Sequence, residues 1–201
     1  MNKIYISIFS LFLSVNLFAQ KSDGTVKSLV NADKAFSQKA TKDGVNAAFN
    51  SFSAPDAIVF RPNSLNVRKY TATAADIKNL KWEPNYARLS KSKDWGVTSG
   101  SYETIGDKKS FGHYLSIWRG KDGDWQFIIN LSTEAIKPIK GKELKPTFIE
   151  PKGTYKQRLA SGKDLKAETD IIYSTEKTLN TMLKTHGVVA FGGFINHDSR
   201  Y

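Results

Sequence analysis

Two ionisable side chains in this sequence, Asp33 and His113, stand where they could do acid–base chemistry. Asp33 lies on the apolar stripe of a helix predicted over residues 25–42, so its carboxylate either faces a cavity or is held by structural hydrogen bonds. His113 lies in a predicted strand, and an imidazole titrates near neutral pH, as a general acid or base must. A strand histidine is also often a packed, hydrogen-bonded residue. The two together form the candidate catalytic pair, with the structural alternative open for each.

The composition excludes several other chemistries. The sequence has no cysteine, which excludes thiol nucleophiles and thiolate metal sites. The three histidines, His113, His186 and His197, lack the spacing of a zinc site, so no metal is expected. The Asp-Gly-Asp at 122–124 lacks the remaining ligands of a calcium loop and is interpreted as a hairpin turn. No phosphate-binding loop or nucleophile-elbow motif occurs, and no cofactor is expected.

A hairpin predicted over residues 111–132 organises the chain. Aromatic and β-branched residues alternate in both arms, and the polar, glycine-containing segment 120–124 supplies the turn. The first arm divides into one face with Phe111, His113, Leu115 and Ile117 and another with Gly112, Tyr114, Ser116 and Trp118. Both faces carry large apolar groups, so we expect both to be covered.

The chain before this hairpin alternates between helical and strand periodicity. Helices are predicted over 25–42 and 45–52, a strand over 57–61, a short helical piece over 74–80, and strands over 86–90 and 95–104. Residues 54–56 are expected to be a turn and residues 63–73 a loop. Helices followed by a four-stranded meander indicate an α+β fold, with helices packed on one face of a curved antiparallel sheet.

Three stretches of the sequence carry a resemblance to a known group of proteins. They are NADKAFSQKATKDGVNAAFNSFSAPDAIVFRP, KWEPNYARLSKSKDWGVTSGSYE and GHYLSIWRGKDGDWQFIINLS. Together they resemble a domain of unknown function in the nuclear-transport-factor-2-like (NTF2-like) superfamily, whose members include SnoaL-like polyketide cyclases and ketosteroid isomerase. The resemblance covers about half of the chain and implies a cone: a bent sheet wraps a long helix and leaves a pocket at the open end.

The resemblance also implies roles for particular residues. The isomerase carries its proton-shuttling Asp just before a Pro on the first strand, and the matching residue here is Arg61. Arginine stays protonated, so the isomerase mechanism does not carry over. If Arg61 faces the pocket it favours an anionic ligand; otherwise it lies in water at a strand end. The region of the isomerase's oxyanion-hole Asp corresponds to Leu115 or its same-face neighbour His113.

The functional reading follows from these residues and leaves alternatives open. The favoured hypothesis is an exported, non-catalytic domain whose pocket binds a small anionic or apolar molecule. The candidate ligand-binding residues are Arg61, Trp82, Tyr102, Leu115 and Asn130. One alternative is an enzyme of the cyclase, isomerase or dehydratase kind that uses His113 with Asp33 or Arg61. Another is a protein-interaction module, with a homodimer formed through the sheet.

The domain organisation is predicted from shifts in composition. Residues 1–19 have the charged, apolar and small-residue order of a signal peptide cleaved near Ala19, which predicts a periplasmic or secreted protein with no membrane contact after cleavage. The cone domain is predicted over 20–136, a Pro- and Lys-rich linker over 137–165, and an incomplete helical second copy over 166–201. The net charge of +11 comes mostly from scattered lysines, so no nucleic-acid partner is expected.

Overall fold

The computed structural model describes residues 22–61, 63–106, 109–121, 123–138, 145–153 and 162–194. The chain divides into two compact units, residues 1–154 and residues 155–201. The predicted signal peptide, and the Asp122 of the predicted hairpin turn, lie outside the described residues.

A seven-stranded sheet forms the body of the first unit over its described residues, in the order β2-β1-β6-β5-β4-β3-β7. The strands are β1 Ser53–Phe60, β2 Ser64–Asn66, β3 Leu80–Leu89, β4 Trp95–Thr104, β5 Phe111–Lys121, β6 Asp124–Ala135 and β7 Thr147–Ile149. Strands β3 to β6 form an antiparallel meander, and β1 joins it in parallel along β6. The sheet is curved and packed against helices, so the predicted α+β fold class is confirmed.

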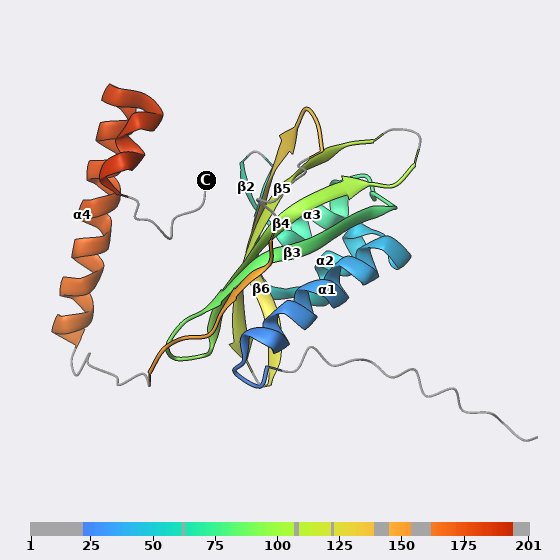
Figure 1. The fold of residues 1–201 in the computed structure, drawn as a ribbon, viewed down its shortest axis with the longest axis horizontal. Coiled ribbons are helices and arrows are strands. Elements are labelled where there is room, and N and C mark those ends of the chain that lie inside the picture. Colours follow the sequence, from blue (N-terminus) through green and yellow to red (C-terminus); the bar gives the residue numbers. More distant parts are fainter. Residues whose placement is uncertain are drawn as a thin grey trace, which may run out of the picture. The chain divides into compact units, whose positions relative to one another are not determined.

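Three helices, α1 Val26–Asp43, α2 Val45–Phe52 and α3 Val67–Thr73, lie on one side of this sheet (Figure 1). The Thr25 side chain caps α1 by accepting from the amide of Ser28 at 3.1 Å. Gly44 ends α1 with φ of 95°, and a Cβ there would meet the Asp76 carboxylate. The chain therefore turns sharply into α2, as the predicted break at this glycine requires.

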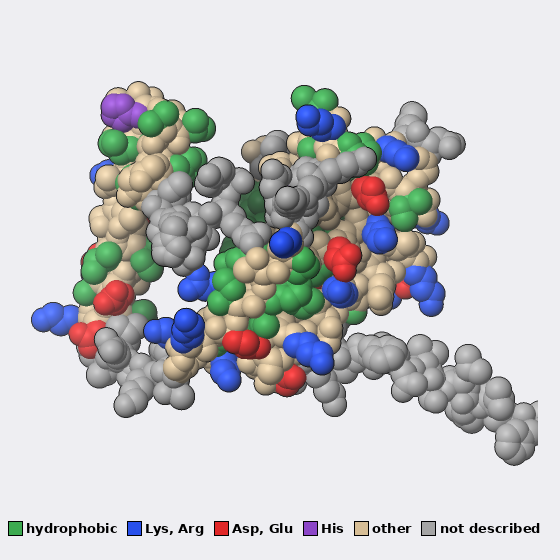
Figure 2. Space-filling view, in the orientation of Figure 1, with side chains coloured by type: hydrophobic (Ala, Val, Ile, Leu, Met, Phe, Trp, Pro, Cys, Tyr) green, Lys and Arg blue, Asp and Glu red, His purple; other side chains and the backbone are tan. Residues whose placement is uncertain are grey.

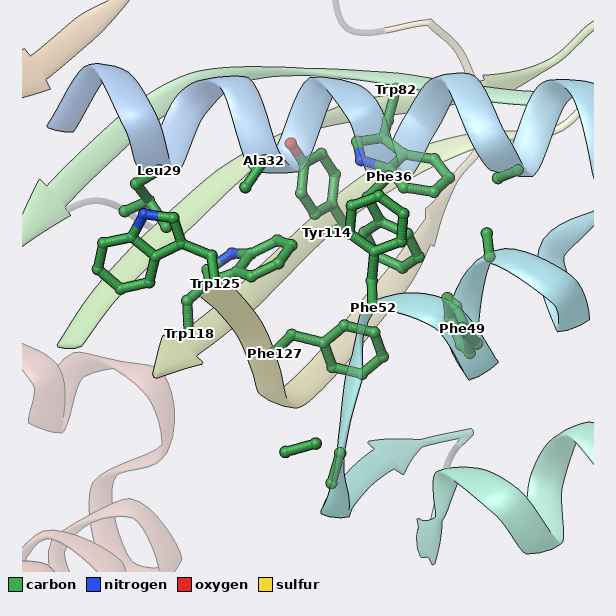
Figure 3. Close-up of a cluster of buried hydrophobic side chains, with 14 of the residues drawn as sticks. Leu29, Ala32, Phe36, Phe49, Phe52, Trp82, Tyr114, Trp118, Trp125 and Phe127 are labelled. Carbon is green, nitrogen blue, oxygen red and sulfur yellow. The ribbon is translucent and has the colours of Figure 1, made fainter. Parts of the chain in front are cut away.

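The core is an aromatic cluster between α1, α2 and the sheet (Figure 3). Phe36 of α1 lies at its centre, with ring centroids 4.7 Å from Trp82, 5.1 Å from Phe52 and 5.2 Å from Phe127. Trp118 and Trp125 are fully buried and belong to the core rather than to a ligand-facing surface. The close ring contacts fix α1 against the concave face of the sheet.

Several local predictions are wrong, among them the start of β3, which begins at Leu80 rather than at residue 86. The sequence predicts a turn over residues 54–56, but these residues belong to β1. Pro55 is tolerated in this strand because the pairing with β6 is irregular between Ser53 and Ile58 and gives Pro55 no strand partner there. The short helix was placed over 74–80, whereas α3 covers Val67–Thr73, inside the predicted loop. Asn66 caps that helix by accepting from the amide of Arg68, a start signal that the apolar pattern does not contain.

The second unit holds α4, Gly162–His186, and the short 3-10 helix η2, Gly187–Gly193. Every described side chain of α4 is at least partly exposed, and Ala190 of η2 is buried. Gly187 has φ of 61°, a left-handed conformation, at the junction between α4 and η2.

The described part of the chain contains no helix that is both long and apolar enough to cross a membrane. Within the same residues, no three His, Asp or Glu side chains gather where they could hold a metal ion. Figure 2 shows Lys and Arg side chains spread over the visible face rather than gathered into one patch.

Candidate ligand-binding cavity

A cavity of about 450 Å³ opens on the helix-covered side of the sheet. Its walls are formed by residues of α2 and α3, by the C-terminal end of β1, and by the helix-facing side of β3 to β6. The lining residues are Val45, Phe49, Phe60, Arg61, Tyr70, Ile77, Leu80, Trp82, Tyr102, Thr104, Ser110, Tyr114, Asn130, Ser132 and Glu134. This volume lies within the roughly 300–1,000 Å³ typical of small-molecule pockets.

Arg61 follows β1 and is held in place by neutral acceptors. Its Nη2 donates to Oδ1 of Asn130 at 2.6 Å, and its Nη1 donates to the carbonyl oxygen of Phe60 at 2.7 Å. Asn130 is itself fixed, because its amide nitrogen donates to Oγ of Ser116 at 3.0 Å. The guanidinium has five N–H donors, so this arrangement orients the group and leaves donors over for a ligand.

The charge of Arg61 is not neutralised within the described residues. The side chain is partly buried, and no described carboxylate forms an ion pair with it. Burial lowers the pKa of Arg61 below its usual value, while the nearby Tyr70 and Tyr102 oppose that shift. The group remains a cation at neutral pH, and a partly desolvated cation without a counter-ion favours an anionic ligand.

The wall across the cavity from β1 is formed by two aromatic side chains that Asp33 holds from behind. Trp82 Nε1 donates to Oδ1 of Asp33 at 2.8 Å, and the Tyr114 hydroxyl donates to Oδ2 at 2.7 Å. Ser37, one helical turn further along α1, accepts from the Trp82 amide at 3.0 Å and donates to the Trp82 carbonyl at 2.7 Å. Trp82 is therefore fixed through both backbone and side chain.

Burial controls the titration of this network. Asp33 is fully buried, and burial raises its pKa, although the hydrogen bonds from Trp82, Tyr114 and Thr98 oppose the rise. Burial also raises the pKa of Tyr114 well above its usual value, and the adjacent Asp33 carboxylate adds to the effect. The Tyr114 hydroxyl therefore keeps its proton at neutral pH and remains a donor to Asp33.

Tyr102 lines the cavity, and its ring lies against Gly112 of the neighbouring strand. A Cβ on Gly112 would lie 2.5 Å from atoms of the Tyr102 ring, so only glycine leaves room for it. Burial raises the pKa of Tyr102, Glu134 raises it further, and Arg61 opposes both. Tyr102 therefore lies within electrostatic range of both charged lining residues.

The structure brings together most, but not all, of the candidate site residues. Arg61, Trp82, Tyr102 and Asn130 line the cavity, and Asp33 lies directly behind it. Leu115 and His113 are not among the described lining residues. Both lie on the face of β5 opposite Tyr114, and Nδ1 of His113 donates to the carbonyl oxygen of Gly100 at 3.1 Å. The proposed pairing of His113 with Asp33 or Arg61 is therefore not assembled at this cavity.

Several lining residues were missed by the sequence reasoning, notably Tyr70, Tyr114, Ser132 and Glu134. In β6 the residues Asn130, Ser132 and Glu134 share one face by period-two alternation. Once Asn130 is assigned to the pocket, the other two follow, and that signal was present in the sequence. Tyr70 had no such signal, because α3 was not predicted.

Comparison with known proteins gives similarity at the level of fold. No protein-family model matches the chain, and no curated protein matches it. Among solved structures, an NTF2-like protein of unknown function from Shewanella oneidensis is 13% identical, covers 53% of this chain and 98% of its own, and has a TM-score of 0.43. The association domain of C. elegans CaMKII is 10% identical, with 53% and 93% coverage and a TM-score of 0.42. A DUF4783 family protein from Bacteroides uniformis is 8% identical, with 52% and 97% coverage and a TM-score of 0.38.

Several of the similar solved structures are NTF2-like proteins, the superfamily that the sequence resembles. At these identities the likeness concerns the fold alone, and the function has to be argued from the cavity itself.

Proposed function

We propose that this chain binds a small amphipathic molecule with one negative charge, and that Arg61 holds the anionic group. The observation that carries the proposal is an arginine at a cavity wall, oriented by Asn130 and the Phe60 carbonyl, with no carboxylate partner among the described residues. A planar carboxylate suits a guanidinium because two parallel N–H donors can bind its two oxygens. The remaining lining residues are mostly apolar or aromatic, which suits an apolar body.

A single negative charge is favoured over two. Arg61 is the one cationic residue among the described lining residues, and Glu134 contributes a carboxylate to the same cavity. A phosphate or dicarboxylate would bring a second negative charge without a second cation to meet it. A monocarboxylate pairs with the single cation and brings no second negative charge.

The test uses a matched pair of probes, para-isopropylbenzoate and para-isopropylbenzyl alcohol, which differ in the charge of one end. Isothermal titration calorimetry should give the carboxylate at least tenfold higher affinity, since a charge-assisted hydrogen bond is worth about 1.5–3 kcal/mol. Arg61→Gln should remove this preference. Arg88→Gln, a control at an exposed arginine of β3 outside the lining, should retain it. Equal affinity of wild type for both probes would count against the proposal.

The enzymatic alternative receives less support from the geometry. A catalytic acid and base must converge on one substrate atom, and His113 lies on the other face of β5 from the cavity-lining Tyr114. A binding function needs no such convergence.

A homodimer through the outer face of the sheet is a second proposal. That face carries two directly opposed apolar pairs, Leu115 with Leu131 and Ile117 with Ile129. Apolar cross-strand pairs away from the helices favour burial against another protein surface. Light scattering should give the mass of a dimer for wild type and of a monomer for Ile117→Asp with Ile129→Asp. A monomeric wild type would contradict the proposal.

We also propose that the protein is exported, on the order of charged, apolar and small residues over 1–19. N-terminal sequencing of the natural protein should then begin near Gln20. Native mass spectrometry of the same material would reveal any co-purified ligand.

A further inference from the structure

Asp33 is not itself among the lining residues, yet it accepts hydrogen bonds from two residues that are. Both of its oxygens are used, one by Trp82 Nε1 at 2.8 Å and the other by the Tyr114 hydroxyl at 2.7 Å. Figure 3 shows the Tyr114 hydroxyl and the Trp82 indole nitrogen turned towards α1, the helix that carries Asp33. The polar ends of both side chains thus point out of the cavity.

The consequence is a wall without hydrogen-bond donors. An indole has one N–H and a phenol one O–H, and Asp33 occupies both. Trp82 and Tyr114 present only ring surface to the cavity. Their ring centroids lie 5.9 Å apart, and the two ring planes are inclined at 58°. Phe49 and Leu80 extend the same apolar lining.

The cation of the cavity and its amide partner lie on the other side of the sheet from Trp82, while the hydroxyl groups of Tyr102, Thr104 and Ser110 belong to the lining near β3. Arg61 and Asn130 belong to the β1 and β6 side, whereas Trp82 belongs to β3, three strands from β6. At about 4.8 Å between strands, this is a separation of roughly 14 Å. Trp82 is therefore far enough from Arg61 for an elongated ligand to reach from one to the other, whereas Tyr114, on β5, lies between them opposite Ser132.

We propose that Asp33 determines which ligands this cavity accepts, by withdrawing the donors of Trp82 and Tyr114 from it. The inference rests on the proposed function, because it concerns the far end of a molecule whose anionic group lies at Arg61. The ligand class is a monocarboxylate whose buried end carries no hydrogen-bond acceptor. A carbonyl turned towards the rings of Trp82 and Tyr114 leaves its water partners and finds no donor on either ring. Asp33 is a positioning residue, since it acts through Trp82 and Tyr114 rather than by touching the ligand.

Two probes of nearly the same shape test this selectivity. para-Isopropylbenzoate and para-acetylbenzoate share the anionic end and differ in a single carbonyl oxygen at the other. Wild type should bind the isopropyl compound about tenfold more tightly, because the acetyl oxygen is left unpaired in the cavity. Equal affinities of wild type for the two probes would overturn the inference. This comparison does not depend on whether any variant folds.

The variant Asp33→Asn tests the cause. An amide offers one acceptor oxygen in place of two carboxylate oxygens, so one of the two donors is released. The preference for the isopropyl probe should fall to threefold or less. A matched control is Ser28→Ala, which releases the indole N–H of Trp125 at a buried site outside the lining. The control should keep the wild-type preference. An unchanged preference in Asp33→Asn overturns the inference.

A second measurement needs no ligand and separates this inference from the proposed function. The indole N–H of Trp82, assigned in NMR spectra with Trp82→Phe, should exchange with solvent at least a hundredfold more slowly than free indole. Exchange at the free rate overturns the role of Asp33, whatever the probes show. If instead Arg61→Gln binds each of the two carboxylates with the same affinity as wild type, the proposed function fails. If binding depends on Arg61 but not on the acetyl group, only the inference about Asp33 fails.

Discussion

At the scale of single residues, the main feature is a carboxylate that is buried without a cation. Asp33 is fully buried and is held by neutral donors alone among the described residues, and burial raises its pKa above the ordinary 3.8. An acid with a raised pKa in the folded state binds its proton more tightly when folded. Its contribution to stability is therefore fully present below the unfolded pKa and is lost as the pH rises through the folded value.

This sign gives a prediction for pH dependence. Asp33→Asn removes the titration, so the stability of wild type relative to this variant should fall as the pH rises from below 3.8 through the raised folded pKa. Urea unfolding curves of both proteins at a series of pH values measure the difference. A difference that stays constant with pH, or that grows in favour of wild type, would contradict the raised pKa.

At the scale of the elements, pairing between neighbouring strands sets the shape of the cavity. Gly112 of β5 lies opposite Tyr102 of β4 and Glu134 of β6, and the Tyr102 ring occupies the space that a side chain at position 112 would need. The carbonyl oxygen of Thr133 would also lie 2.0 Å from such a Cβ.

We therefore expect Gly112→Ala to displace Tyr102 and distort β6. Overpacking of this kind should lower the free energy of unfolding by about 1–3 kcal/mol and weaken probe binding. Gly192→Ala, where an added Cβ meets nothing within 4 Å, is the matched control and should change neither. If Gly112→Ala binds para-isopropylbenzoate as wild type does, Tyr102 has no part in shaping the cavity.

The strongly periodic elements could be predicted from the sequence. Which face of each strand meets the helices could not. The α1 helix, β4 and the β5–β6 hairpin follow from helical spacing and strict alternation. Both faces of β5 carry large apolar groups, so alternation alone did not tell which face meets the helices. Leu115 and Asn130 were both assigned to the pocket, but Leu115 pairs with Leu131 and Asn130 with Ser116, so they lie on opposite faces.

Some features depend on contacts that no local pattern contains. The bonds from Trp82 and Tyr114 to Asp33 span 49 and 81 residues of sequence. From the sequence alone, Asp33 is either a cavity-facing acid or a structural one. Its position directly behind the cavity wall combines parts of both interpretations, because the carboxylate is structural and the residues it holds line the cavity.

At the scale of the whole molecule, the cavity belongs to one of two units. Every described lining residue lies within the unit of residues 1–154, and none comes from the described residues 162–194 of the second unit. The first unit also has its own buried core. Binding and the second unit should therefore be separable.

Deletion of residues 155–201 should leave the affinity for para-isopropylbenzoate within about twofold of wild type. Calorimetry on the two purified proteins gives the comparison, and circular dichroism confirms that the shortened chain is folded. A loss of tenfold or more in a folded deletion variant would mean that the second unit takes part in binding.

The central claim is that the cavity holds an amphipathic monoanion with its charged end at Arg61. The most direct measurement is a crystal structure of the protein with para-bromobenzoate, whose bromine is located by anomalous scattering. The carboxylate should lie within hydrogen-bond distance of the Arg61 guanidinium, and the bromine against the rings of Trp82 and Tyr114. A bromine peak beside Arg61, or a probe bound only outside the cavity, would contradict it.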